Sequence, residues 1–342
     1  GTHGKTTTTS MLSHILLAGE MDPTISVGGI LKAIGGNIRV GDSGLFVTEA
    51  CEYTNSFLHF FPKIGIILNI DEDHLDFFKD LADIRNSFRK FAELLPEDGT
   101  LIINGNIPDL GEIIDGLKCR VLVYGNDSSM DYSATNISHN NLGEASFDLV
   151  KSGTFVDRIS LSVNGDHNVS NALASIVAAD LLDIPVETMK KGLKEFHGTN
   201  RRFEHKGDVN GITIIDDYAH HPTEINASLT AAKNYPHREI WCIFQPHTYT
   251  RTKALFPEFV EALSHTDHII LADIYAARET DTLGISSKDI ADALIENGRD
   301  AYYFPSFKEI EDFCMEKCQK GDLLITMGAG DVVNIGEDLL KR

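Results

Sequence analysis

Short apolar runs alternate with helical patterns along the first part of the chain, and polar residues follow several of these runs directly. Continuous apolar runs are typical of strands buried in a parallel sheet. They lie at residues 45–50, 63–70, 101–104 and 121–124, with helical spacing at 81–95 and 108–117. Glycine pairs at 27–30 and 34–37 indicate turns. This alternation predicts an α/β fold, in which ligands bind at the carboxyl ends of the strands.

The pattern changes to period two after about residue 130. Alternating segments occupy 132–137, 145–150 and 159–163, and they predict an antiparallel sheet set against the first one. Helical spacing then returns at 168–182 and 186–195.

Residues 196–203 have the composition of a hinge, and strand and helix patterns alternate again beyond it. Strands are expected near 212–216, 239–244, 267–271 and 322–326, and helices near 222–233, 252–263, 287–296, 307–317 and 331–340. We therefore expect two domains, a mostly parallel one over 1–199 and a doubly wound α/β one over 200–342.

The charge balance narrows the possible partners. The 342 residues include 30 Lys and Arg against 51 Asp and Glu, so the net charge is −21. Such a field disfavours nucleic acids and anionic membrane surfaces. No apolar run approaches the roughly 18 residues of a membrane span, and five scattered cysteines suggest reduced thiols. These features favour a cytoplasmic protein without membrane insertion, and we expect Cys314 and Cys318 to be packing residues.

The first ten residues carry the clearest chemical signal. Gly4, Lys5 and Thr6 precede helical apolar spacing, as at the end of a phosphate-binding loop that enters its helix. In such a loop Lys5 reaches the β- and γ-phosphates of a nucleotide and the Thr6 hydroxyl holds Mg²⁺. The usual first glycine and the strand that feeds the loop are expected before residue 1. The alternative is a simple glycine-rich helix cap.

Acidic residues follow the next two apolar runs. Glu49, directly after residues 45–48, is a candidate Mg²⁺ ligand, and Glu52 is a weaker one. The loop at 69–76 contains four acids and His74, a candidate second metal ligand or general base. The competing interpretation of each is a solvated side chain.

Further polar segments lie at the starts of helices and in the second domain. Asn168 is expected to cap the helix that begins at 168, where His167 and Asn171 are candidate nucleotide contacts. Arg201 and Arg202 form either a phosphate clamp or a solvated basic pair. Two dense polar loops, 216–224 and 245–252, follow apolar strands, and the second supplies Arg251 for a carboxylate. Residues 327–331 form a glycine turn with a structural role or an anion contact.

These motifs, in this order, resemble those of the Mur ligases of peptidoglycan synthesis. The matching strings are Gly-Thr-His-Gly-Lys-Thr-Thr-Thr-Thr from residue 1, Glu-Ala-Cys-Glu-Tyr from 49, Asn-Ile-Asp-Glu-Asp-His from 69, His-Asn-Val-Ser-Asn from 167, Gly-Thr-Asn-Arg-Arg-Phe from 198, Asp-Asp-Tyr-Ala-His-His-Pro-Thr-Glu from 216 and Gln-Pro-His-Thr-Tyr-Thr-Arg-Thr from 245. The resemblance implies a central P-loop ATPase-type domain, a C-terminal Rossmann-like ligase domain, and an N-terminal UDP-substrate domain that is expected upstream.

The resemblance also implies roles for individual residues. Those for ATP are Gly1, Thr2, His3, Gly4, Lys5, Thr6, Thr7, Asn171, Arg202 and Asp217. Those for Mg²⁺ are Thr6, Glu49 and His74, and those for the substrates are Tyr218, His220, His247 and Arg251. Lys5, His74, His220 and Arg251 are the implied catalytic residues. Thr248 departs from the family pattern, in which many members have arginine, and Cys51 replaces a common aspartate.

Within the family, the resemblance is closest to the members that join L-alanine to UDP-N-acetylmuramate. It implies that a substrate carboxylate attacks ATP to give an acyl phosphate, which the amino acid then converts to an amide. Lysine and Mg²⁺ stabilise the charge on the transferring phosphoryl group in such chemistry. The alternatives are a ligase that adds a tripeptide to the same sugar nucleotide, a P-loop NTPase without ligation, and a nucleotide-binding module.

Overall fold

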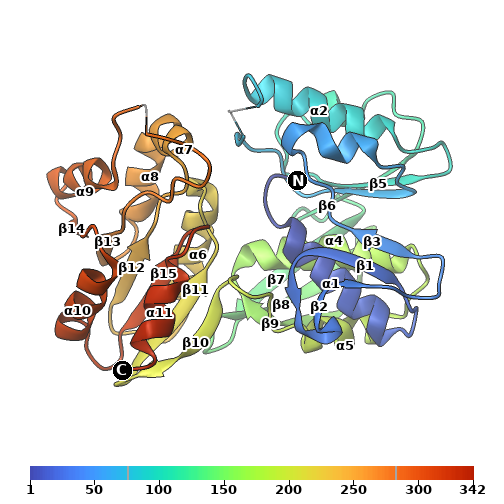
Figure 1. Ribbon diagram of the computed structural model, residues 1–342. Helices are drawn as coiled ribbons and strands as arrows, with labels where there is room; N and C mark the ends of the chain where they lie inside the picture. The colour runs from blue at the N-terminus through green and yellow to red at the C-terminus, as the bar shows by residue number, and fades with distance from the viewer. Residues whose placement is uncertain (75–76, 282) are drawn as a thin grey trace. The chain divides into compact units, whose positions relative to one another are not determined.

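The structure is a computed structural model that describes residues 1–74, 77–281 and 283–342. Leu75 and Asp76, at the end of the acidic loop, lie outside the described residues. The chain divides into two compact units, which are described separately here (Figure 1). The first unit comprises residues 1–140 and 144–200, and the second comprises 141–143 and 201–342.

A six-stranded sheet forms the centre of the first unit. Its order is β4-β5-β6-β7-β8-β9. The strands are β4 (Ile64–Ile67), β5 (Thr100–Asn104), β6 (Arg120–Gly125), β7 (Tyr132–His139), β8 (Glu144–Lys151) and β9 (Thr154–Asn164). Strands β4 to β7 are parallel, and β7, β8 and β9 are antiparallel.

The prediction of a separate antiparallel sheet is therefore wrong. Tyr132 and Ser133 of β7 pair in parallel with Tyr124 and Gly125 of β6, so the antiparallel strands extend the parallel sheet. Asp131, just before β7, accepts a hydrogen bond from the Val123 amide at 2.8 Å. This contact holds the start of β7 beside β6.

Three further strands form a small sheet in the same unit, with the order β2-β1-β3. They are β1 (Thr24–Leu31), β2 (Gly36–Arg39) and β3 (Phe46–Thr48), with a short 3₁₀ segment, η1 (Lys32–Ile34), between β1 and β2. The turn expected at 27–30 is wrong, because β1 continues through it with Val27 and Leu31 buried. The turn expected at 34–37 is confirmed by Gly35, whose φ is +65°.

The parallel strand expected at 45–50 is present as β3, but it is shorter than expected and is not fully buried. β3 is parallel to β1, but Phe46 is 59% exposed. β3 lines a cavity of about 710 Å³ together with Ile64 and Ile66 of β4.

Helices cover both faces of the six-stranded sheet. One face carries α1 (Lys5–Ala18), α4 (Asp166–Asp180) and α5 (Val186–Glu195), and the other carries η2 (Tyr53–His59), α2 (Leu81–Glu93) and α3 (Gly111–Ile114). Strand alternation separates the two cores, since Ile102 packs on the α1 side and its neighbours Leu101 and Ile103 pack on the α2 side. Nine of the 14 residues of α1 are buried, so this helix is enclosed rather than amphipathic.

The second unit has one six-stranded sheet with the order β10-β11-β15-β12-β13-β14. The strands are β10 (Glu204–Val209), β11 (Ile212–Asp217), β12 (Ile240–Phe244), β13 (His268–Leu271), β14 (Asp300–Tyr303) and β15 (Leu323–Met327), all parallel except β10. One face packs against α6 (Pro222–Lys233), α8 (Phe256–Leu263) and α9 (Ser287–Glu296), and the other against α10 (Phe307–Lys317) and α11 (Val333–Leu339).

The four central strands of this sheet confirm the prediction, whereas both edge strands, β10 and β14, were not predicted. The helix expected at 252–263 is two helices, α7 (Tyr249–Ala254) and α8, separated at Leu255. Pro257 lies in the first turn of α8, where a missing N–H is tolerated, but it cannot continue α7. Cys314 and Cys318 are buried and unbridged, as expected of packing residues. Among the described residues, no helix has the length and apolar character needed to cross a membrane.

The packing of α1 against α5 generates a stability prediction. A Cβ atom on Gly192 of α5 would lie 2.6 Å from the Ile15 Cα of α1, so Gly192→Ala forces the two backbones apart. Overpacking costs about 1–3 kcal/mol, against roughly 1 kcal/mol that alanine gains over glycine in a helix. We expect urea denaturation to show a net loss of about 1–2 kcal/mol in the free energy of unfolding.

The control is Lys191→Ala, at an exposed position of the same helix. It should change the free energy of unfolding by less than about 0.5 kcal/mol. Equal stability of the two variants would contradict the close packing of α1 and α5.

Candidate functional site

The amino-terminal end of α1 is a bare helix end. Gly4, the residue before the helix, has φ +82°, and as a glycine it has no side chain with which to cap the first-turn amides. The loop before it is fastened to the residues that follow β4, because the His3 amide donates to Asn69 Oδ1 at 2.8 Å and the Thr2 amide donates to the Asn69 carbonyl at 3.3 Å. Amides at a helix N-terminus bind anions. This end of α1, from Gly1 to Thr7, is therefore a candidate phosphate site.

Asn171 supports the loop from behind. A Cβ atom on Gly4 would lie 2.5 Å from Asn171 Oδ1, so only glycine fits there. Asn171 is buried, accepts a hydrogen bond from the Thr8 hydroxyl at 3.3 Å and donates to Asn168 Oδ1 at 3.1 Å. Its place in the structure is beneath the loop, and a contact with a nucleotide stays a prediction.

Asn168 was expected to cap the helix, and this is wrong. α4 begins earlier, at Asp166, with Gly165 at φ +90° before it. The Asn168 side chain lies inside the first turn and donates to the Asn164 carbonyl at 2.7 Å.

Lys5 is held in place by three oxygen atoms. Its Nζ donates to the carbonyls of Gly1 and Thr2, both at 2.8 Å, and to Glu52 Oε1 at 3.1 Å. Glu52 is only 2% exposed, and its other carboxylate oxygen has no hydrogen-bond partner in the described structure. The lysine charge therefore compensates a buried carboxylate beside the candidate phosphate site.

Oxygen donors next to Lys5 suit a hard cation. The Thr6 hydroxyl donates to Glu49 Oε2 at 3.1 Å, and Glu49 Oε1 accepts the Gly28 amide. A Cβ atom on Gly28 would lie 2.9 Å from the Glu49 carboxylate, which explains the glycine inside β1. His74 Nε2 lies 3.8 Å from Glu52 Oε1. The Thr6 hydroxyl and the Glu49 carboxylate are oxygen ligands of the kind that Mg²⁺ prefers, so these two side chains fit the ion. A metal contact of His74 stays a prediction.

The carboxyl end of β11 carries two buried aspartates in the second unit. Asp217 accepts hydrogen bonds from the amides of Phe203 and Ala219, at 2.9 and 2.8 Å, and from the Ser228 hydroxyl at 2.9 Å. Burial raises the pKa of Asp217 to about 6, against the opposing influence of Arg202. These contacts anchor the backbone at Phe203, and an interaction of Asp217 with ATP stays a prediction.

The two arginines of the expected hinge differ in their surroundings. Arg201 Nε donates to Asp216 at 2.9 Å, and its two terminal nitrogens donate to the carbonyls of Gly330 and Gly328 at 2.9 and 2.7 Å. The glycine turn thus binds a cation through its carbonyls. Arg202 lies over the Tyr218 ring at 5.3 Å and 3.6 Å from Glu224. Of the pair, Arg202 is the better candidate for a phosphate contact.

Aromatic and basic side chains gather where β11, β12 and β13 end. The ring centroids of His220 and His247 are 5.9 Å apart, and His247 stacks on Tyr275 at 5.7 Å. Arg251 Nη1 lies 3.1 Å from His247 Nδ1. Tyr218 contacts His220 edge to ring at 5.5 Å. The four predicted substrate residues therefore form one cluster.

Sequence reasoning missed two members of this cluster. Tyr275 follows β13, a strand that was predicted. Its position after the carboxyl end of this strand is the sequence feature that could have identified it as a site residue. Glu224 lies within the polar loop that was recognised, but it was not singled out, and the structure places it against His220 at 3.3 Å.

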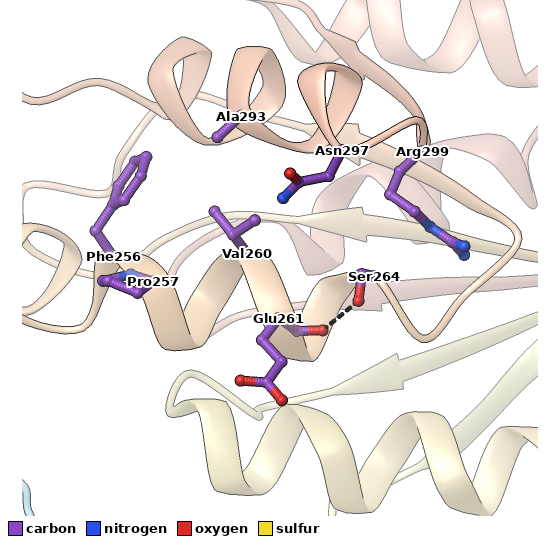
Figure 2. A pocket seen from close by; sticks show the side chains of 8 residues that line it. All are labelled: Phe256, Pro257, Val260, Glu261, Ser264, Ala293, Asn297 and Arg299. Atoms are coloured by element: carbon purple, nitrogen blue, oxygen red, sulfur yellow. Dashed lines mark hydrogen bonds between the residues drawn. The ribbon is translucent and has the colours of Figure 1, made fainter.

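A separate cavity of about 510 Å³ lies between α8 and α9 (Figure 2). Val260 and Ala293 point toward one another across it, and Arg299 lies at its end, just before β14. The cavity adjoins the amino ends of β13 and β14, whereas ligands in open α/β sheets bind at the carboxyl ends. We assign it no role.

The buried Asp217 generates a prediction for the pH dependence of stability. Its pKa is higher in the folded chain than in the unfolded chain, so the folded state binds more protons between about pH 4 and 6. Stability from this group is present below about pH 4 and is lost as the pH rises through 6. Relative to Asp217→Asn, the wild-type chain should lose up to about 3 kcal/mol across this window.

The measurement is urea denaturation of both proteins at several pH values. Other groups, including Asp216, whose pKa burial also raises, contribute to both curves and cancel in the difference. A difference that stays constant between pH 4 and 7 would contradict the assignment.

Comparison with known proteins places both units in one family. Residues 1–179 match the model of the Mur ligase middle domain, and residues 201–330 match that of the Mur ligase, glutamate ligase domain. The chain is 57% identical to UDP-N-acetylmuramate--L-alanine ligase of Lachnospira eligens and 59% identical to that of Agathobacter rectalis. Each alignment covers 100% of this chain and 74% of the relative.

Comparison with solved structures supports the same family. UDP-N-acetylmuramate-alanine ligase MurC from Thermotoga maritima superposes with a TM-score of 0.83 at 29% identity, over 100% of this chain and 74% of that chain. A murein peptide ligase from Psychrobacter arcticus superposes with a TM-score of 0.72 at 27% identity, over 100% and 75%. From these matches and the geometry of its two clusters, the chain belongs to the Mur ligase family.

Proposed function

We propose that this chain catalyses the ATP-dependent joining of L-alanine to UDP-N-acetylmuramate, with release of ADP and phosphate, in the cytoplasm. The observation that carries the proposal is the bare end of α1, where Lys5 and the Thr6–Glu49 pair lie together. Relatives 50–59% identical to this chain have the name of this activity.

In the first step, a substrate carboxylate attacks the γ-phosphate of ATP to form an acyl phosphate. The first-turn amides of α1 bind the phosphate oxygens, and Lys5 moves from Glu52 to the transferring phosphoryl group, where it offsets negative charge. Thr6 and Glu49, with His74 nearby, would hold Mg²⁺, which supplies charge neutralisation when bound. Before the nucleotide binds, Glu52 holds the positive charge of Lys5 close to the loop.

In the second step, the amine of the amino acid displaces phosphate from the acyl carbon. The second unit contributes cations for this step, since Arg251 and Arg202 offer guanidinium forks that match a carboxylate or a phosphate. His247 positions Arg251 through their 3.1 Å contact. Roles for Tyr218, His220, His247 and Arg251 in binding the substrates are part of this proposal.

The amino acid acceptor separates this proposal from its alternatives. Phosphate release by the full-length protein is measured with ATP, Mg²⁺ and UDP-N-acetylmuramate, with L-alanine, glycine or the tripeptide added separately. Dependence on L-alanine, with a product of matching mass, is the expected result. Dependence on the tripeptide alone would assign the chain to the peptide-adding type, and release without any acceptor would contradict ligation.

Replacing Lys5 tests the phosphate site. We expect Lys5→Ala to lower the rate of phosphate release by about 10²–10³-fold or more, since a preorganised cation at the developing charge is lost. The substitution also leaves Glu52 buried without its cation. Lys5→Arg is therefore made as well, because the guanidinium keeps the positive charge but has a different geometry from the ammonium.

The matched control is Lys118→Ala, whose side chain is 79% exposed. It should retain full activity, and circular dichroism of all three variants reports folding. Wild-type phosphate release from a folded Lys5 variant would exclude the site.

A further inference from the structure

Glu224 occupies the third position of α6, next to the cluster of histidines. The helix begins at Pro222 with His221 as its cap, so the Glu224 side chain reaches back along the chain. Its Oε2 accepts the His220 amide at 3.2 Å and lies 3.3 Å from His220 Nδ1, while its Oε1 lies 3.6 Å from Arg202. With 12% of its side chain exposed, Glu224 is largely shielded from water.

The contacts of His220 determine where its ring proton lies. Nδ1 faces the Tyr218 carbonyl oxygen at 3.0 Å and Glu224 Oε2 at 3.3 Å. A carbonyl and a carboxylate only accept hydrogen bonds, so Nδ1 must carry the proton. In the neutral ring, Nε2 is then the nitrogen with the lone pair, as the partner of the second nitrogen fixes the tautomer of a histidine.

Several other groups face this pair. The rings of Tyr218 and His247 lie against the imidazole, with centroids at 5.5 and 5.9 Å, and Arg202 approaches the carboxylate from the segment before β10. Arg251 reaches the cluster through His247. Glu224 therefore contacts the imidazole with one carboxylate oxygen and lies close to the Arg202 cation with the other.

We propose that Glu224 is a positioning residue that holds His220 with Nε2 unprotonated, so that Nε2 accepts a proton from the amino group of the incoming amino acid. The inference rests on the proposed function. The N–H bond of the ammonium breaks and its proton moves to Nε2. The amine nitrogen bonds to the acyl carbon, and the bond from that carbon to the phosphate oxygen breaks, with its electron pair leaving on phosphate. The nitrogen then loses its second proton to the departing phosphate, which leaves as hydrogen phosphate.

A purely structural role for Glu224 makes a different prediction. A glutamate at the third helical position commonly accepts a backbone amide before the helix, and glutamine does so equally well. Glu224→Gln therefore keeps this backbone contact and removes only the negative charge. Glu309 is a matched control, because it occupies the same position of α10, contacts Ser306 and lies exposed.

The first measurement is the ¹⁵N NMR spectrum of the imidazole rings in this chain, with His220 assigned by its absence in His220→Gln. The expected result is a protonated Nδ1 and an unprotonated Nε2 in the wild-type and Glu309→Gln proteins. In Glu224→Gln only the Tyr218 carbonyl still favours this tautomer, so we expect a larger fraction of rings protonated on Nε2. A wild-type ring protonated mainly on Nε2 would overturn the proposal.

The second measurement separates the two chemical steps in the full-length protein. Hydroxylamine trapping reports the acyl phosphate, and mass spectrometry reports the amide. For Glu224→Gln we expect trapping within about twofold of wild type and amide formation lowered by about 10²-fold, the usual contribution of a general base. Glu309→Gln should match wild type in both.

Wild-type amide formation by Glu224→Gln, or an equal loss in both steps, would overturn the proposal. If the wild-type protein forms no acyl phosphate, the proposed function is wrong, and so is the role of His220 as a general base in it. The NMR result still reports the tautomer in that case, so the two failures are distinguishable.

Discussion

The ion pair between Lys5 and Glu52 holds the loop that leads into α1. A carboxylate that is 2% exposed is costly unless a cation compensates it, and Lys5 supplies that charge while also binding the carbonyls of Gly1 and Thr2. The pair therefore fixes the loop, and the loop fixes the first turn of α1. The Lys5 ammonium therefore lies beside the candidate phosphate site, oriented by its three oxygen partners.

The second unit uses buried carboxylates in a related way. Asp216 and Asp217 end β11 in the interior, and their hydrogen bonds hold Arg201 and the Phe203 amide. Arg201 and Phe203 both have positive φ, at 61° and 47°, a conformation that the surrounding contacts must maintain. The same anchoring leaves Arg202 directed at Tyr218 and Glu224. The position of Arg202, a candidate phosphate contact, thus depends on these two buried carboxylates.

Sequence patterns identified most of the fold and the loops of the site, because buried parallel strands are continuous apolar runs and polar residues follow them. The patterns failed where the structure depends on contacts between strands that are not adjacent in the prediction. The junction of β6 with β7 joins two sheets that periodicity separates, and β10 and β14 are edge strands with polar faces. Glu224 and Tyr275 were missed because only folding shows what they contact, and Gly28 looked like a turn although it accommodates Glu49 inside a strand.

The most direct test of this account is a crystal structure with a non-hydrolysable ATP analogue and Mn²⁺, whose anomalous signal locates the metal. The account predicts phosphate oxygens on the first-turn amides of α1, Lys5 moved from Glu52 to the γ-phosphate, and Mn²⁺ bound to the Thr6 hydroxyl and the Glu49 carboxylate. A triphosphate bound away from α1, or a bound triphosphate with Lys5 still paired to Glu52, would contradict it.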